Sequence, residues 1–256
     1  MNIQFDHLVH LTKNPEKAQQ TFTSLGFRTI KGGHHPNWGT YNSLCFFQNL
    51  RYIEWIGFTD FLTAKNCHNP LINQIVFDYK NGEGFSQIAF RTNDIHSLKH
   101  SLEKKGFQTI GPINGSRQKE DGSFLSWNML FLKEDNVDLR YPFFIQWEEK
   151  DDNRKKEMKE LMRHSIGTPS LSSIGYFVQR PEEMATNFAM ILNVEVSSIK
   201  EKINQLGTYF DLSINQFSLR FYKHQNFSNK PVICEISGFH KENTININGA
   251  RYLFTK

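Results

Sequence analysis

Hydrophobic and polar residues alternate at the start of the chain and then change to a helical spacing. Residues 5–9 follow the period-two pattern of a strand, in which successive side chains point to opposite faces. Ala18, Phe22 and Leu25 come next at the i, i+4 and i+7 spacing of a helix with one buried face. Asn14 precedes them at the N-cap position, where a short polar side chain accepts from free backbone amides. The pattern predicts a strand followed by one amphipathic helix.

The same pattern occurs a second time without a gap. Residues 85–89 match the first strand, and Asp94 takes the N-cap position of Asn14. Leu98 and Leu102 repeat the apolar face of the helix. A duplication of this kind indicates that the chain is built from a repeated structural unit.

Each predicted helix is followed by further strands. The strand candidates are residues 41–47 and 51–55 in the first copy and residues 125–132 and 143–147 in the second. Trp55 and Trp147 coincide when the last strands of the two copies are aligned. The unit is therefore a strand, a helix and a meander, with the first repeat at about residues 3–58 and the second at about residues 84–148.

A third, weaker copy begins at Leu171, where the helical pattern returns and Ser173 stands at the position of His7. The segment before it is dense in charge, which predicts a solvated helical linker. The predicted organisation is paired modules at residues 1–148, the linker at residues 149–170 and a third module at residues 171–256.

Composition and charge narrow the classes of function. The 256 residues are 38% hydrophobic and 22% charged, which is typical of a soluble globular protein, and the 23 Phe residues are the main excess. The net charge of +4 comes from 30 basic and 26 acidic residues spread along the chain, without a basic run interleaved with aromatic residues. We therefore expect no nucleic-acid partner.

No targeting or membrane segment is recognisable in the sequence. The chain starts with a strand pattern instead of a basic and then apolar leader, and no run reaches the ~20 apolar residues of a membrane span. We expect a cytoplasmic protein without a membrane partner, in which Cys45, Cys67 and Cys234 are reduced thiols. No phosphate-binding or dinucleotide-binding loop occurs, so we expect no nucleotide cofactor.

Strand alternation gathers polar residues on one face of the predicted sheet. If the neighbouring apolar residues pack under the helices, the opposite face presents His7 and Glu54 in the first copy. The corresponding residues of the second copy are Gln87 and Gln146. The aromatic residues expected on the same face are Phe5, Phe85, Tyr52 and Phe144. A small polar cluster within an aromatic surface is typical of a ligand pocket.

Paired βαβββ modules with a polar residue on the first and last strand of each resemble the vicinal oxygen chelate superfamily, which includes glyoxalases, ring-cleaving dioxygenases and antibiotic-resistance proteins. Residues 33–42 (GHHPNWGTYN) are similar to an HPxWGTxN stretch of its glyoxalase-like branch, and residues 248–252 fit its C-terminal pattern. The resemblance implies an α+β fold in which paired modules form one curved mixed sheet of the glyoxalase/bleomycin-resistance/dioxygenase type, with a third half-module.

The resemblance also implies a metal site. In metal-dependent members these positions chelate a divalent ion such as Zn, Ni, Mn or Fe, which assists lyase, isomerase or dioxygenase chemistry. The implied metal ligands are His7, Glu54, Gln87 and Gln146, with Glu54 also as the catalytic base. Gln at two of these positions leaves one anionic ligand, which weakens the attraction for a divalent cation. The alternative is a metal-free protein that binds or sequesters a small oxygenated or aromatic metabolite, with His7 and Glu54 as a hydrogen-bonded pair.

Further candidate substrate contacts lie in the loop after the first helix and along the strands. The loop residues are His34, His35, Trp38, Thr40 and Asn42, and the strand residues are Tyr52, Arg91 and Phe144. Adjacent His34 and His35 cannot both point the same way on an extended chain. The alternative for the loop is a structural turn in which Trp38 plugs the end of the barrel. Arg91 and Arg140 could instead reach solvent, where we also expect His10 and His164.

The third module raises a question of assembly. Its strand candidates at residues 209–212 and 217–221 are apolar enough that leaving them exposed would cost ~25 cal/mol per Å². They could pack on the first two modules or meet the same strands of a second chain. We expect the second arrangement, a homodimer, because modules of this superfamily usually come in pairs. Glu235 is assigned no metal, since Ser173 replaces the histidine of that copy.

Overall fold

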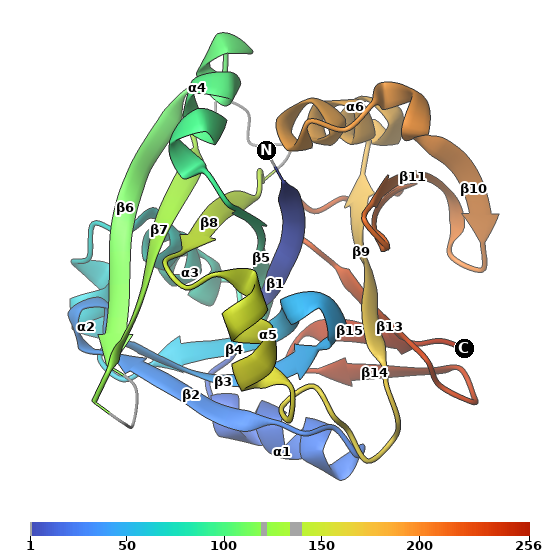
Figure 1. Cartoon of the computed structure of the whole chain (residues 1–256). Coiled ribbons are helices and arrows are strands. Elements are labelled where there is room, and N and C mark those ends of the chain that lie inside the picture. Colours follow the sequence, from blue (N-terminus) through green and yellow to red (C-terminus); the bar gives the residue numbers. More distant parts are fainter. Residues whose placement is uncertain (1, 119–121, 134–139) are drawn as a thin grey trace.

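The computed structural model describes residues 2–118, 122–133 and 140–256, whose strands form two sheets (Figure 1). The first sheet has eight strands in the order β2-β3-β4-β1-β5-β8-β7-β6. The second has seven strands in the order β10-β11-β12-β9-β13-β15-β14. Non-consecutive neighbours in both sheets show that each is built from crossover units, as the repeat predicts.

The first module forms one half of the eight-stranded sheet. Its elements are β1 (Ile3–Leu11), α1 (Pro15–Ser24), β2 (Ile30–His35), β3 (Thr40–Phe47) and β4 (Arg51–Phe58), with 3-10 helices at Pro36–Trp38 and Gln48–Leu50. β1 pairs parallel with β4, and the Asn14 side chain caps α1 by accepting from the Lys17 amide. The predicted strand, helix and cap are confirmed. Helices α2 (Phe61–Lys65) and α3 (Pro70–Tyr79) connect it to the second module.

The second module forms the other half of this sheet. Its elements are β5 (Gly84–Thr92), α4 (Ile95–Lys104), β6 (Thr109–Gln118), β7 (Phe124–Leu132) and β8 (Phe143–Trp147). Asp94 caps α4 by accepting from the Ser97 amide. β5 pairs parallel with β8 and antiparallel with β1, so the two modules join into one mixed sheet. The predicted α+β fold of paired βαβββ modules is confirmed.

The third module follows α5 (Asp151–Met158). Its elements are β9 (Ser170–Val178), α6 (Pro181–Leu192), β10 (Lys200–Asn204), β11 (Gly207–Ile214) and β12 (Phe217–Lys223), with a 3-10 helix at Val196–Ser198. The last strands are β13 (Ile233–Ser237), β14 (Asn243–Ile247) and β15 (Ala250–Phe254). β13 pairs antiparallel with β9 and parallel with β15, as β5 does with β1 and β8. The C-terminal region thus contains a complete module and the strands of a fourth, with no helix between β13 and β14.

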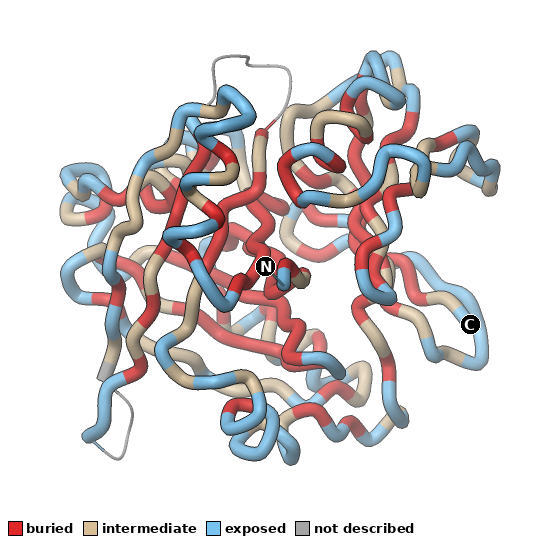
Figure 2. Tube along the Cα trace, turned by 45° about the horizontal axis from the view of Figure 1, so that its top comes forward, coloured by how far each residue is buried: buried red, intermediate tan, exposed pale blue. Residues whose placement is uncertain are grey.

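One hydrophobic core joins the two sheets. It includes Phe22 and Trp55 from the first module and Tyr252 from β15, and Figure 2 shows buried segments on both sides of this contact. The Arg51 guanidinium donates to the backbone carbonyls of residues 171, 215 and 216 across the contact. The apolar face of the third module is therefore covered within its own chain. This removes the reason for expecting a homodimer, and the oligomeric state itself stays a prediction.

Two register shifts between β1 and β5 change which face the neighbouring residues occupy. The pairing shifts between Phe5 and His7 and again between Val9 and His10. A bulge adds one residue to one strand, so side chains beyond it change face. Phe5 therefore points away from the His7 face and stacks on Phe217 with ring centroids 4.0 Å apart. Phe85 likewise packs in the core between the sheets, so the prediction that these two rings surround the polar cluster is wrong.

Strand β8 has a different alignment from the one that the sequence suggested. Phe143 lies opposite Ala89, as Glu54 lies opposite Val9 in the first module. Phe143, and not Gln146, therefore occupies the position equivalent to Glu54. The second module thus presents a phenyl ring where the first presents a carboxylate.

The new alignment reverses the faces that were predicted for β8. Phe144 packs in the core between the sheets, while Phe143, Ile145 and Trp147 face the concave side of the first sheet. Gln146 points the other way, and its Oε1 accepts from the Ile95 amide at the start of α4. The predictions that Phe144 contacts substrate and that Gln146 ligates a metal are wrong. Aligning Trp147 with Trp55 had put the residues of β8 out of register with their equivalents in β4.

Candidate functional site

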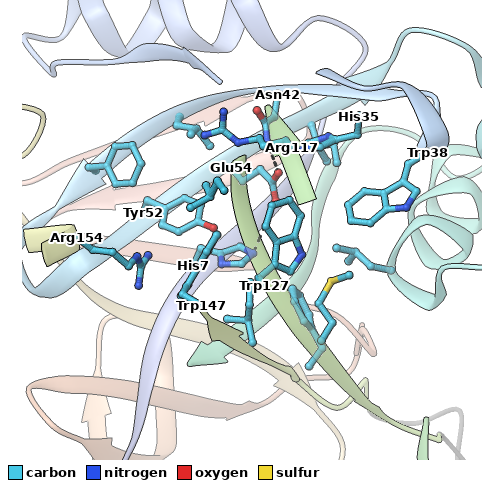
Figure 3. A pocket seen from close by; sticks show the side chains of 18 of the residues that line it. His7, His35, Trp38, Asn42, Tyr52, Glu54, Arg117, Trp127, Trp147 and Arg154 are labelled. Carbon is cyan, nitrogen blue, oxygen red and sulfur yellow. Dashed lines mark hydrogen bonds and ion pairs between the residues drawn. The ribbon is translucent and has the colours of Figure 1, made fainter. Parts of the chain in front are cut away.

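The first sheet encloses a cavity on the face that carries His7 (Figure 3). Its aromatic lining residues are Trp38, Phe46, Tyr52, Trp127, Phe143 and Trp147, and its polar lining residues are His7, His35, Asn42, Glu54, Arg117 and Arg154. The space open to the centres of water-sized molecules is about 70 Å³. Because one water needs only ~10–15 Å³ on this measure, the cavity has room for a small ring compound.

The cavity is closed on one side where the two end strands of the sheet, β2 and β6, come together. Gly33 permits this approach, because a Cβ atom there would lie 2.6 Å from Cδ of Arg117. The Arg117 side chain lies against this glycine and ends at the cavity, where Figure 3 labels it. A glycine in β2 thus brings a cation from the second module to the site.

A buried carboxylate and a histidine lie side by side at the centre of the cavity wall. His7 Nδ1 is 2.8 Å from Asp6 Oδ1, and His7 Nε2 is 3.7 Å from Glu54 Oε2. The imidazole also stacks on the Tyr52 ring, with centroids 4.5 Å apart. A hydrogen bond at one ring nitrogen fixes the orientation of the other. Asp6 thereby directs Nε2 of His7 toward Glu54 and the cavity, and this His7–Glu54 pair can exchange a proton with a bound molecule.

The hairpin of β2 and β3 positions Glu54. Asn42 Nδ2 donates to Glu54 Oε1 at 2.5 Å, and the Gly33 amide donates to Asn42 Oδ1 at 2.7 Å. His35, which lies beside these residues, has Nδ1 3.2 Å from the Thr40 hydroxyl. The hairpin thus holds one oxygen of the carboxylate and leaves the other facing His7.

Burial shifts the ionisation of two groups in this wall. Burial lowers the pKa of His35 to about 4, although the nearby Glu54 charge opposes the shift. Burial alone would raise the pKa of Asp6, but the hydrogen bond from His7 and the charges of Arg154 and Arg91 hold it below its ordinary value. At neutral pH the wall therefore contains an ionised Asp6 and a neutral His35.

The four predicted metal ligands do not meet. His7 and Glu54 lie together in the cavity wall, whereas Gln146 is on the opposite face of β8. Gln87 is buried, but its Nε2 donates to the Tyr141 carbonyl and its Oε1 accepts from the Ile88 amide. Both polar ends of Gln87 bond to backbone and the side chain does not line the cavity, so the structure does not bring this predicted ligand to His7 and Glu54.

The predicted substrate contacts divide into two groups. His35, Trp38, Asn42 and Tyr52 line the cavity. His34 is exposed, as expected for one of two adjacent histidines on an extended chain, so its assignment to the site is wrong. Thr40 is fully buried behind His35 and supports the imidazole instead of lining the cavity.

Several polar residues that were expected in solvent are buried in ion pairs and hydrogen bonds. Arg91 is 4% exposed, binds the Phe5 carbonyl at 2.8 Å and pairs with Asp151 at 2.9 Å, so it neither reaches solvent nor lines the cavity. Arg140 is 2% exposed and pairs with Asp78. His10 and His164 are buried as well. Each prediction failed because the partner lies far away in the sequence.

Several cavity residues were not identified from the sequence, among them two tryptophans and two arginines. Arg117 and Trp127 come from the hairpin of β6 and β7, and Trp147 comes from the misaligned strand β8. Arg154 comes from α5, whose charge-dense sequence predicted a solvated linker. Figure 1 shows α5 in front of the curved first sheet. Arg154 and Met158 of this helix line the cavity, so α5 covers it on that side. A single arginine facing inward leaves no periodic signal in such a segment.

The second sheet carries a different set of residues at the equivalent positions. Arg220 lies opposite Gly175 on β9, as Glu54 lies opposite Val9 on β1. Its guanidinium forms an ion pair with Glu235 and lies 3.5 Å from Asp211. This face therefore neutralises its own charges.

Comparisons with known proteins give a family and a fold. A model described as a glyoxalase-like domain matches residues 5–192. A hypothetical protein from Staphylococcus aureus superposes with a TM-score of 0.83 at 22% identity, over 98% of each chain. A xylose isomerase-like TIM barrel/4-hydroxyphenylpyruvate dioxygenase fusion protein superposes with a TM-score of 0.50 at 11% identity, over 92% of this chain and 36% of its own. Methylmalonyl-CoA epimerase from Mycobacterium tuberculosis gives 0.41 at 14% identity, over 59% and 91%.

Two further findings concern the curated proteins and the helices of this chain. A search by sequence among curated proteins finds no significant match. Among the described residues, no helix is both long and apolar enough to cross a membrane. At these identities the structural neighbours support the fold alone.

Proposed function

Because the chain belongs to the glyoxalase-like domain family, we propose that it binds a small aromatic or oxygenated molecule in the cavity of its first sheet. The observation that carries this proposal is the lining, in which three indoles surround the His7–Glu54 pair. Trp127 lies 6.0 Å from Trp38 and 5.5 Å from Trp147 between ring centroids. Aromatic walls with a few placed polar groups are typical of sites for small ligands.

The residues of this cavity do not fit a tight divalent-metal centre. In the parts of the chain that the structure describes, no group of three or more His, Cys, Asp or Glu side chains could hold an ion. His7 and Glu54 reach the cavity, but Phe143 stands where the second module would have to supply a ligand. A site for Zn, Ni, Mn or Fe needs more oxygen, nitrogen or sulfur donors than this pair. We therefore favour metal-free binding over metal-assisted lyase, isomerase or dioxygenase chemistry.

Divalent cations are expected to stabilise the protein no more than they stabilise a His7→Ala variant. A ligand that binds only the folded state raises the melting temperature more the more tightly it binds, and two donors give little affinity for a divalent cation. Thermal unfolding of both proteins with added Zn²⁺, Ni²⁺ or Mn²⁺ checks this. A stabilisation that appears only when His7 is present would show that the cavity does hold a metal.

Narrowing the cavity is expected to weaken binding of a small aromatic probe. Leu125 is a buried lining residue of β7, and a Leu125→Trp substitution would fill part of the space. We expect phenol, followed by calorimetry or ligand-observed NMR, to bind the variant roughly tenfold or more weakly than the natural protein. Ile203→Trp on β10, where the side chain is 78% exposed, is the matched control. The proposal would be contradicted if the natural protein did not bind phenol. It would also be contradicted if the natural protein, Leu125→Trp and Ile203→Trp bound phenol equally well.

A further inference from the structure

Arg154 is an inward-facing cation on the helix that covers the cavity. It is 1% exposed although it lies in a segment of otherwise mostly exposed charged residues. Its guanidinium carbon lies 4.4 Å from the centre of the Trp147 ring, and the side chain lines the cavity (Figure 3). Burying a guanidinium is costly unless acceptors and counter-charges compensate. The contacts of its three nitrogen atoms should therefore indicate why this guanidinium is buried.

One nitrogen of the guanidinium, Nη1, has partners, and the other two have none among the described residues. Nη1 is 3.3 Å from Asp151 Oδ1 and 3.9 Å from Asp6 Oδ2. Nε and Nη2 are buried without a hydrogen-bond acceptor among the residues that the structure describes. These two nitrogens form one edge of the planar group and present two parallel N–H bonds. Because Arg154 lines the cavity, a molecule bound there is the available source of their acceptors.

The neighbouring carboxylates are already committed to other donors. Asp6 accepts from His7 at 2.8 Å and from the Trp147 indole at 3.1 Å, and Asp151 accepts from Arg91 at 2.9 Å. Across the cavity, Glu54 accepts from Asn42. The charged groups of the lining itself are Arg117 and Arg154 against Glu54. This balance favours a ligand with a negative charge.

We infer that the bound molecule is a small aromatic carboxylate, held at its carboxylate by Nε and Nη2 of Arg154. This inference rests on the proposed function of the cavity and adds the chemical class of the ligand. The two oxygens of a carboxylate match the two parallel N–H bonds of a guanidinium edge. The aromatic ring of the ligand then lies against Trp147 and Trp127, whose centroids are 5.5 Å apart.

The test compares matched acids and amides. Benzoate and benzamide, and phenylacetate and phenylacetamide, differ in charge but hardly in shape, and calorimetry gives their affinities. In the natural protein we expect each carboxylate to bind roughly tenfold or more tightly than its amide, because hydrogen bonds to charged groups are the stronger ones. Arg154→Met should bring the ratio close to one, while Arg154→Lys should keep part of it. Lys155→Met, at a half-exposed neighbour on α5, should leave the ratio unchanged.

The outcomes separate this inference from the proposed function. Equal affinities for acid and amide in the natural protein would overturn the inference while leaving the cavity as a binding site, and this comparison requires no variant to fold. A preference that survives in full in Arg154→Met would place the anion elsewhere and would also overturn it. If neither these probes nor phenol binds the natural protein, the proposed function itself fails and the inference fails with it.

Discussion

Replacing Asp78 with Ala is expected to lower the free energy of unfolding by about 3–5 kcal/mol. Asp78 on α3 and Arg140 before β8 are 3% and 2% exposed. Arg140 binds the carboxylate through two nitrogens, at 2.7 Å and 3.0 Å, and its Nη1 also donates to the Ser86 carbonyl. Removing the carboxylate would leave a buried guanidinium without its counter-charge. Urea denaturation followed by circular dichroism measures the effect.

A double variant distinguishes the lost charge from lost packing. Asp78→Leu combined with Arg140→Met replaces the ion pair with apolar side chains and leaves no charge unpaired. Such replacements are often neutral or stabilising, so we expect the double variant to be much more stable than Asp78→Ala. A double variant that is as unstable as the single one would show that the side-chain volume of Asp78, and not its charge, stabilises this contact.

The repeat could be predicted because its signals are local. The N-caps Asn14 and Asp94 and the apolar faces of the two helices occur within a few residues of each other, and each was found where the pattern placed it. Strand and helix periodicity together predicted the repeated unit of a strand, a helix and a meander. The pairing of two such units into one curved sheet was implied by the resemblance to the superfamily.

The face of each strand was harder to predict because it depends on pairing. Trp55 and Trp147 look equivalent in the sequence, yet Trp55 packs in the core between the sheets and Trp147 lines the cavity. The alignment is set by Ala89 opposite Phe143, a contact between residues far apart in the chain. Likewise, no local signal marks the shift between Phe5 and His7. A displacement of a single residue reverses the faces of a whole strand.

The site was predicted in part for the same reason. His7 and Glu54 were assigned to the correct face and meet in the cavity, although Phe5 on the same strand as His7 was not. Arg154 could not be found, because a charged residue on a short polar helix is normally solvated. It is buried because α5 lies over the cavity near Asp6, which is determined by tertiary packing. The proposed anion contact therefore depends on the one cavity residue that the sequence gave least reason to choose.

Acidification is expected to destabilise the protein between about pH 6.5 and pH 4 through His10 and His35. Both are buried, and burial lowers the pKa of each to about 4 in the folded protein. In the unfolded chain each imidazole has a pKa near ~6.5 and takes up a proton first. The folded state therefore loses stability as the pH falls through this window, by roughly 3 kcal/mol for each histidine, and the loss levels off below the folded pKa. Denaturation at a series of pH values measures this slope.

Variants assign the slope to individual histidines. His35→Asn removes one of the two groups, so its free energy of unfolding should fall less steeply between pH 6.5 and pH 4 than that of the natural protein. His10→Asn should act in the same way, although it also loses the contacts to the Tyr252 hydroxyl and the Asn248 carbonyl and will be less stable at pH 7. His100→Asn, at an exposed position of α4, should leave the slope unchanged. An unaltered slope in both the His10 and the His35 variants would mean that the folded protein accepts protons at these buried imidazoles as readily as the unfolded chain does.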